Sequence, residues 1–134
     1  MVSLVIQHIE QPKKIIEEGL YRKSGDLAKI NKMKTEINQK GPKCIKFEDK
    51  EEIHTYTGLL KLYFREMPEP IIPYNLYGPC IVAAGSPAEI RSQMIAQVLG
   101  LLPPANKAIL KLLCVHLQKE SWLGFGVKLL IECR

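Results

Sequence analysis

An all-α fold is predicted from three features of the sequence. Apolar residues recur at intervals of three and four positions in several segments, which is the spacing of one helix face. Residues that favour helix ends, such as Asp, Ser, Gly and Pro, flank these segments. No segment of the sequence alternates apolar and polar residues as a half-buried strand does. With 134 residues, of which 46% are hydrophobic and 25% charged, the chain has the length and composition of one globular domain.

Two helices are predicted in the first 41 residues. The first, "SLVIQHIE", has Ser3 as its cap, and Pro12 prevents it from running on. The second runs through "DLAKINKMKTEINQKG", with Asp26 as its N-terminal cap and Gly41 just past its end. The apolar stripe of the second helix consists of Leu27, Ile30, Met33 and Ile37.

A third helix of about 16 residues is predicted to begin at the D-x-x-E pattern of Asp49 and Glu52 and to end before Pro68. The next segment, "MPEPIIP", contains three prolines, so an extended connector is expected there. The apolar stripe of the third helix consists of Ile53, Tyr56, Leu60, Tyr63 and Phe64.

Three more helical segments follow the connector. The first, "YNLYGPCIVAAG", is expected to form a broken helix that ends near Gly85. The second has Ser86 at its cap, Pro87 in its first turn and Glu89 completing a capping box. In the third, "ANKAILKLLCVHLQKE", His116 falls among core positions and is expected to be a hydrogen-bonded or surface histidine rather than a catalytic one. The core positions of this last helix are Ile109, Leu110, Leu113 and Leu117.

Composition excludes several classes of protein. The formal net charge is +5 and the isoelectric point is about 9.0, which favours an acidic partner surface. The basic residues are interspersed with acidic ones and form no block, so nucleic-acid binding is not expected. No apolar run approaches the ~18 residues needed to cross a bilayer, and the first residues lack a secretory signal pattern. A cytoplasmic protein without a transmembrane segment is therefore predicted.

The residues that commonly hold metals or act as nucleophiles are scattered. The serines and histidines form no local nucleophile pattern, so hydrolase chemistry by this chain alone is not expected. The cysteines form no CxxC pair and have no histidine at metal-ligand spacing, which argues against both a zinc site and disulfides. These cysteines are Cys44, Cys80, Cys114 and Cys133.

The segment "GLYRKSG", residues 19–25, is predicted to be a presented loop. Gly19 and Gly25 permit sharp bends at both ends, so Tyr21 and the two cations after it are expected to project from the surface. An ordinary surface turn with solvated charges is the alternative.

Three segments together resemble a known family. In order and approximate spacing, "GLYRKSG", "GLLKLYFREMPEPIIPYNLY" and "LLPPANKAILKLLCVHL" resemble the GTPase-activating domain for Rho-family small GTPases, the RhoGAP domain. The middle segment is the most specific, because it carries a Leu-Lys-x-x-x-Arg-x-x-Pro-x-Pro pattern at a helix end. The resemblance covers residues 2 to about 118 and implies a RhoGAP-like helical bundle, with the domain at residues 1–118. It also implies that the chain accelerates GTP hydrolysis by a partner GTPase.

The resemblance also implies roles for particular residues. By motif position, Arg22 is the arginine that enters the partner's active site, so the chain supplies a catalytic group in trans without itself being an enzyme. Arg65 is implied to brace the backbone of the loop and Lys61 to contact the GTPase. GTP and Mg²⁺ are implied to belong to the partner, a Rho-family GTPase in its GTP-bound form, and no cofactor or metal is expected in this chain. The other implied site residues are Gly19, Ser24 and Gly25, which support the loop, and Pro68 and Pro70, which lie at the GTPase-binding surface.

Residues 119–134 depart from the resemblance. The family is implied to continue into further helices, one of which contributes an asparagine that contacts the GTPase, and Asn106 in an earlier helix is not expected to replace it. A truncated domain that lacks its C-terminal helices, with a divergent tail at residues 119–134, is therefore expected. This leaves open a non-catalytic module that binds a GTPase or another protein. No motif specifies the preferred GTPase or the oligomeric state.

Overall fold

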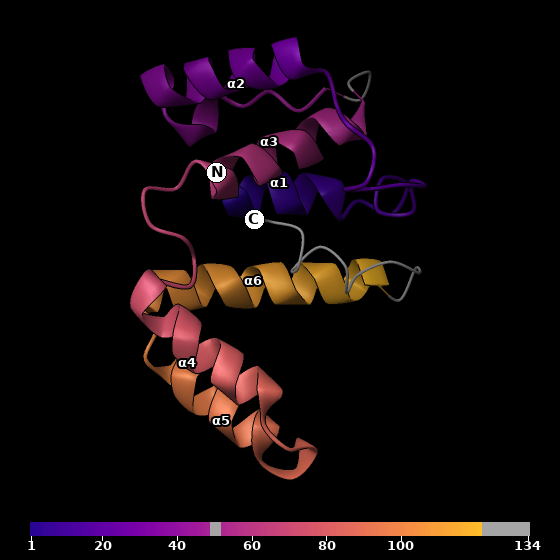
Figure 1. Ribbon diagram of the computed structural model, residues 1–134. Helices are drawn as coiled ribbons and strands as arrows, with labels where there is room; N and C mark the ends of the chain where they lie inside the picture. Colours follow the sequence, from indigo (N-terminus) through magenta and orange to yellow (C-terminus); the bar gives the residue numbers. More distant parts are fainter. Residues whose placement is uncertain (49–51, 122–134) are drawn as a thin grey trace. The chain divides into compact units, whose positions relative to one another are not determined.

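The computed structural model describes residues 1–48 and 52–121. In these ranges it contains six α-helices, one short 3₁₀ helix and no strand (Figure 1), so the predicted all-α fold is confirmed. The helices fall into two compact units. The first contains residues 1–66 and the described residues from 114 onward, and the second contains residues 67–113. None of the described helices is both long and apolar enough to cross a bilayer.

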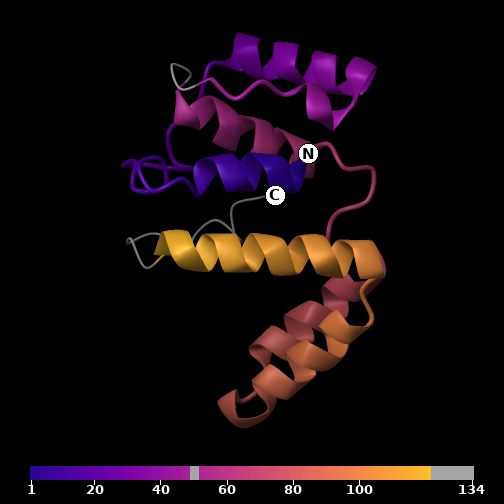
Figure 2. The ribbon, with the colours of Figure 1, turned by 180° about the vertical axis from the view of Figure 1, so that it is seen from behind.

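Helix α3 is the central element of the first unit. It spans Ile53–Arg65, lies between α1 (Val2–Ile9) and α2 (Leu27–Lys40), and packs against both (Figures 1 and 2). The 3₁₀ helix η1 (Pro42–Cys44) follows α2 and packs back on it. The unit also includes the C-terminal part of α6 (Pro104–Ser121). The loop between α1 and α2 therefore joins helices on opposite sides of α3.

The core of the first unit is built from the apolar faces of α1 and α3. Val5, Ile6 and Ile9 of α1 are at most 1% exposed. Tyr56 and Leu60, two of the predicted stripe residues of α3, are buried to the same degree. Spacings of three and four residues place such side chains on one face of each helix. Full burial of one large apolar side chain contributes about 1.5–3 kcal/mol, so these residues fix the packing of α1 on α3.

Helix α2 begins and ends as its sequence predicts. The Asp26 carboxylate accepts hydrogen bonds from the N–H groups of Ala28 at 2.9 Å and Lys29 at 3.2 Å. Gly41 follows the last helical residue with a φ of 82°, and its N–H donates to the carbonyl of Ile37 at 2.8 Å. Two of the free N–H groups at the start of α2 thus have a local acceptor, and Gly41 closes its last turn.

The boundaries of α1 and α3 differ from the prediction. The carbonyl of Met1 accepts the N–H of Val5 at 3.1 Å, so α1 begins at residue 2 and Ser3, its predicted cap, lies inside the helix. Helix α3 has 13 residues, fewer than the predicted length, and Glu52 is its N-cap without a side-chain hydrogen bond. Asp49, the other half of the predicted start, lies outside the described residues.

The predicted capping box of α5 (Ala88–Gly100) is wrong. The Ser86 hydroxyl donates to the carbonyl of Val82 at 2.9 Å, in the last turn of α4 (Tyr74–Gly85). Ser86 therefore ends α4, and Pro87 occupies the N-cap position of α5 without a side-chain hydrogen bond. Because the N-cap position of α5 falls on Pro87, the Ser86 hydroxyl lies one residue too early to cap this helix.

Helix α4 is continuous, whereas a broken helix was expected from its proline. Pro79 lies inside it and lacks the N–H that would bond the carbonyl of Asn75. Asn75 is exposed, so water can bind the carbonyl that loses its partner. Because the carbonyl that loses its partner lies in the exposed first turn, α4 continues past Pro79.

The second unit consists of α4, α5 and the N-terminal part of α6, and α4 and α5 lie side by side (Figure 2). Its buried centre is formed by Leu76 of α4, Leu102, which follows α5, and Leu110 of α6. The proline connector is attached to this centre, because Asn106 Nδ2 donates to the carbonyl of Ile71 at 3.0 Å. Asn106 thus holds the connector within its own unit.

We expect Asp26→Ala to lower the free energy of unfolding by about 1 kcal/mol, the usual loss for an N-cap. Two N–H groups of α2 would lose their shared acceptor. Urea unfolding measures the change. Asn38→Ala, at an exposed position of the same helix, is the control and should have little effect. Equal losses in the two variants would contradict the capping role.

Candidate functional site

Residues 19–25, which we call the arginine loop, begin with a tight turn. Gly19 has a φ of 77°, and its carbonyl accepts the N–H groups of both Arg22 and Lys23 at 2.9 Å. A positive φ of this size is readily adopted by glycine and rarely by other residues. The turn therefore fixes where the chain lies immediately before Arg22.

Tyr21 is buried, and its predicted exposure is wrong. Its side chain is 4% exposed, and it has a φ of 66°, the only positive φ among the non-glycine residues that the structure describes. The left-handed conformation costs an L-residue about 1–2 kcal/mol, so contacts elsewhere must offset it. One of them is a hydrogen bond of 2.8 Å from Lys61 Nζ to the Tyr21 carbonyl.

At Gly25 the end of the loop packs closely against the first turn of α3. A Cβ atom at this position would lie 2.4 Å from the carbonyl oxygen of His54 and 2.5 Å from the Cα of Thr55. The next residue, Asp26, donates its N–H to Thr55 Oγ1 at 3.4 Å. Only a residue without a side chain allows the loop backbone to approach α3 this closely.

Arg22 extends into solvent from this fixed backbone. Its side chain is 71% exposed, and its guanidinium lies 3.9 Å from the carboxylate of Glu18, which is still more exposed. An ion pair between two exposed side chains contributes little and is readily exchanged for another partner. Lys23 and Ser24 beside it are exposed as well. The loop thus presents a guanidinium that an anionic group can reach.

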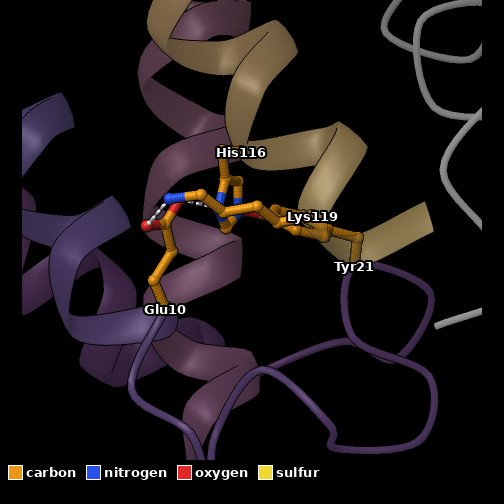
Figure 3. A network of polar contacts seen from close by, with 4 residues as sticks. All are labelled: Glu10, Tyr21, His116 and Lys119. Atoms are coloured by element: carbon orange, nitrogen blue, oxygen red, sulfur yellow. Dashed lines mark hydrogen bonds and ion pairs between the residues drawn. The ribbon is translucent and has the colours of Figure 1, made fainter. Parts of the chain in front are cut away.

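A chain of hydrogen bonds, buried at Tyr21 and His116, holds the other side of the loop (Figure 3). We call it the polar cluster: Tyr21, His116 and Lys119 of α6, and Glu10, which follows α1. The Tyr21 hydroxyl lies 2.5 Å from His116 Nε2, and His116 Nδ1 lies 3.1 Å from the Glu10 carboxylate. Lys119 Nζ donates to the same carboxylate at 2.6 Å. The predicted core position of His116 is confirmed by its full burial.

The carboxylate determines how protons are arranged in the polar cluster. Because an ionised carboxylate only accepts hydrogen bonds, a neutral His116 carries its proton on Nδ1 and donates it to Glu10. Nε2 is then an acceptor, and the Tyr21 hydroxyl donates to it. In the series of hydrogen bonds from Tyr21 through His116 to Glu10, each donor therefore meets an acceptor.

Burial sets the protonation state of His116. Loss of solvent lowers the pKa of His116 more than the neighbouring Glu10 carboxylate raises it, and the charge of Lys119 lowers it further. For Glu10, burial raises the pKa, but the hydrogen bonds and charges of Lys119 and His116 outweigh burial and lower it. The neutral ring and the ionised carboxylate are thus the favoured forms near neutral pH.

The other predicted site residues are placed as follows. Lys61, which was assigned to the GTPase surface, is half-buried and hydrogen-bonded to the loop, whereas Arg65, the assigned brace, is exposed at the end of α3. Pro68 and Pro70 belong to the connector in the second unit. The functional roles of these four residues stay predictions.

No group of His, Cys, Asp or Glu side chains suited to a metal ion occurs within residues 1–48 and 52–121. Cys44, Cys80 and Cys114 are free thiols, and Cys133 lies outside the described residues. Sequence reasoning missed the polar cluster: it did not name Glu10 or Lys119, and it did not connect Tyr21 with His116. The one available signal was His116 itself, because a histidine on an apolar helix face requires buried partners.

Comparison with known proteins identifies a family that fits this geometry. A family model of the RhoGAP domain matches residues 1–121. Beta-chimaerin of Mus musculus is 40% identical over 123 residues, which are 90% of this chain and 37% of that protein. The Rho GTPase-activating protein gacY of Dictyostelium discoideum is 41% identical over 106 residues, 76% of this chain and 14% of that protein. This chain therefore spans less than half the length of either relative.

Two solved structures have the same fold. Human Rho GTPase activating protein 15 is 31% identical with a TM-score of 0.81, and the match covers 91% of this chain and 58% of that one. The BH domain from GRAF, the GTPase regulator associated with focal adhesion kinase, is 30% identical with a TM-score of 0.81. That match covers 91% of this chain and 65% of the GRAF chain.

Gly25→Ala should reduce stability by about 1–3 kcal/mol, because the new methyl group would overlap backbone atoms of α3 that have little freedom to move. Thermal unfolding measures the loss. The control is Gly78→Ala inside α4, where an added Cβ meets no atom within 4 Å. That change should be neutral or stabilising by up to about 1 kcal/mol. Similar behaviour of the two variants would argue against a close contact at Gly25.

Lowering the pH from about 7.5 to about 5.5 should destabilise the fold through His116, whose ordinary pKa is about 6.5. The unfolded ring titrates at this value, whereas the buried ring stays neutral to lower pH because its pKa is lowered. Below the ordinary value the unfolded state binds more protons, so stability falls as the pH falls through this window. Glu10, also with a lowered pKa, adds a loss only near and below about pH 4.3.

Urea unfolding at a series of pH values tests this expectation. His116→Gln, which does not titrate, should show a shallower dependence on pH between about 7.5 and 5.5 than the unaltered chain. Identical dependences in the two proteins would mean that His116 has the same pKa in the folded and unfolded states.

Proposed function

The chain belongs to the RhoGAP domain family, and we propose that it accelerates GTP hydrolysis by a Rho-family small GTPase in the GTP-bound form. In this proposal Arg22 enters the partner's active site, and the partner supplies GTP and Mg²⁺. The observation that carries the proposal is an exposed guanidinium on a loop whose backbone is held on both sides.

The chemistry needs a cation at one point of the reaction. Negative charge on the oxygens of the transferred phosphoryl group is stabilised by a guanidinium that is already in position. Such an arginine accelerates hydrolysis by about 10³–10⁵, which corresponds to roughly 4–7 kcal/mol of the barrier. A side chain that had to be ordered first would contribute less.

The geometry supports a preordered backbone at Arg22. The residue before Arg22 is buried, the turn at Gly19 bonds the Arg22 N–H, and Gly25 is seated on α3. The guanidinium itself is held only by an exposed ion pair to Glu18. Its backbone is therefore fixed while its charge is available to a partner.

Arg22→Ala should remove most of the acceleration, about 10³–10⁵ in rate, because its charge acts mainly in the transition state. Binding to the GTP-bound partner should change little. Arg22→Lys should fail as well, since one ammonium does not reproduce the planar donor array of a guanidinium. Single-turnover GTP hydrolysis with several Rho-family GTPases measures the rate, and a binding assay with a non-hydrolysable GTP analogue measures the affinity.

Lys23→Ala is the matched control, because it removes the adjacent exposed cation of the same loop. It should retain most of the acceleration. Parallel losses of affinity and rate in Arg22→Ala would make Arg22 an ordinary interface residue. Binding without acceleration by the unaltered chain would favour the alternative, a non-catalytic GTPase-binding module.

A further inference from the structure

We infer that His116 is a positioning residue for the arginine loop: through Tyr21 it holds the backbone conformation from which Arg22 is presented. The consequence for catalysis rests on the proposed function, whereas the effect on the loop does not. The inference rests on one observation: the fully buried His116 is hydrogen-bonded to Tyr21, the residue immediately before Arg22.

The backbone conformation of Tyr21 requires stabilising contacts. Its left-handed backbone is unfavourable for a side chain with a Cβ, so the conformation persists only if its surroundings enforce it. Lys61 bonds the Tyr21 carbonyl, and His116 both bonds the hydroxyl and meets the ring edge at a centroid distance of 5.7 Å. Tyr21 is therefore held at its backbone and at the far end of its side chain.

His116 is itself fixed, which allows it to fix another residue. Its ring is fully buried, and its second nitrogen donates to Glu10 at 3.1 Å. Glu10 is in turn bonded by Lys119 at 2.6 Å, one turn further along α6. Figure 3 shows these side chains converging from α6, from the residue after α1 and from the loop. Rotation of the ring would break bonds at both nitrogens at once.

The link from Tyr21 to Arg22 is the backbone itself. The two residues are adjacent, and the Arg22 N–H donates to the Gly19 carbonyl within the same turn. If φ of residue 21 relaxed toward a common negative value, the peptide to Arg22 would swing and that hydrogen bond would be lost. The polar cluster thus sets the direction in which Arg22 leaves the loop.

The experiment compares Tyr21→Phe, His116→Leu and His116→Gln. The first removes only the hydroxyl, the second removes the acceptor, and the third keeps an amide oxygen near the position of Nε2. Tyr63→Phe, a hydroxyl deletion at a partly exposed position of α3, is the matched control. Circular dichroism melts show which variants unfold cooperatively. If a His116 variant does not fold, the test rests on Tyr21→Phe, which is the mildest change.

Hydrogen exchange of the Arg22 and Lys23 amides, measured on the chain alone, reports directly on the stability of the loop's hydrogen bonds. We expect exchange to accelerate about 3- to 10-fold in Tyr21→Phe and His116→Leu, the size expected for one lost hydrogen bond. His116→Gln should lie closer to the unaltered chain, and Tyr63→Phe should match it. Unchanged exchange in Tyr21→Phe would overturn the inference, whatever the chain does to a GTPase.

Single-turnover hydrolysis at saturating chain then tests the catalytic consequence. Tyr21→Phe should lower the rate about 3- to 10-fold without weakening binding, and should have no further effect in Arg22→Ala. If Tyr21→Phe lowered the rate by the same factor in the unaltered chain and in Arg22→Ala, its effect would not act through the position of Arg22, and the inference would be overturned. Faster loop exchange in Tyr21→Phe, together with no acceleration by the unaltered chain, would support the loop assignment while defeating the proposed function.

Discussion

The backbone of Tyr21 is the constraint around which the arginine loop is arranged. Glycine would adopt its φ of 66° at no steric cost, but it would leave the loop without a side chain to anchor. Tyrosine accepts about 1–2 kcal/mol of backbone strain and buries a ring that ends in a hydrogen-bond donor. The burial of Tyr21 and the exposure of Arg22 are thus two results of one local geometry, because consecutive side chains leave this turn in different directions.

Two buried histidines show how much such a geometry depends on partners. His116 is bonded at both ring nitrogens, so its tautomer is defined and its ring acts as a rigid spacer between Glu10 and Tyr21. His54 is equally buried, yet its Nδ1 has no hydrogen-bond partner in the described part of the chain. His54 contributes instead through its backbone, whose carbonyl packs against Gly25 and accepts the Thr57 hydroxyl at 3.0 Å. A fully satisfied polar network is stiff, whereas an unsatisfied buried nitrogen is a local cost.

Local signals in the sequence predicted much of the fold, and long-range partners explain what they missed. Asp26 and Gly41 define α2 correctly because a cap depends on residues within one turn. The same reasoning failed at Ser86, which lies between two helices and bonds the earlier one. Periodicity placed His116 in the core, but no local pattern could name Glu10 or Tyr21 as its partners. The assignment of Arg22 came from resemblance to a family, since spacing alone does not separate a catalytic arginine from a solvated one.

The hydrogen bond from Tyr21 to His116 spans 95 positions of the chain, and residues 67–113 form a separate unit between its ends. A ribosome makes the loop well before it makes α6. Until α6 has been made, the Tyr21 hydroxyl and the Glu10 carboxylate therefore hydrogen-bond to water in place of His116. Contacts between distant positions form slowly, although the entropy of closing a long loop rises by only about 0.6 kcal/mol for each doubling of its length. A nascent chain would thus expose Arg22 early but acquire its fixed orientation only after α6 has been made.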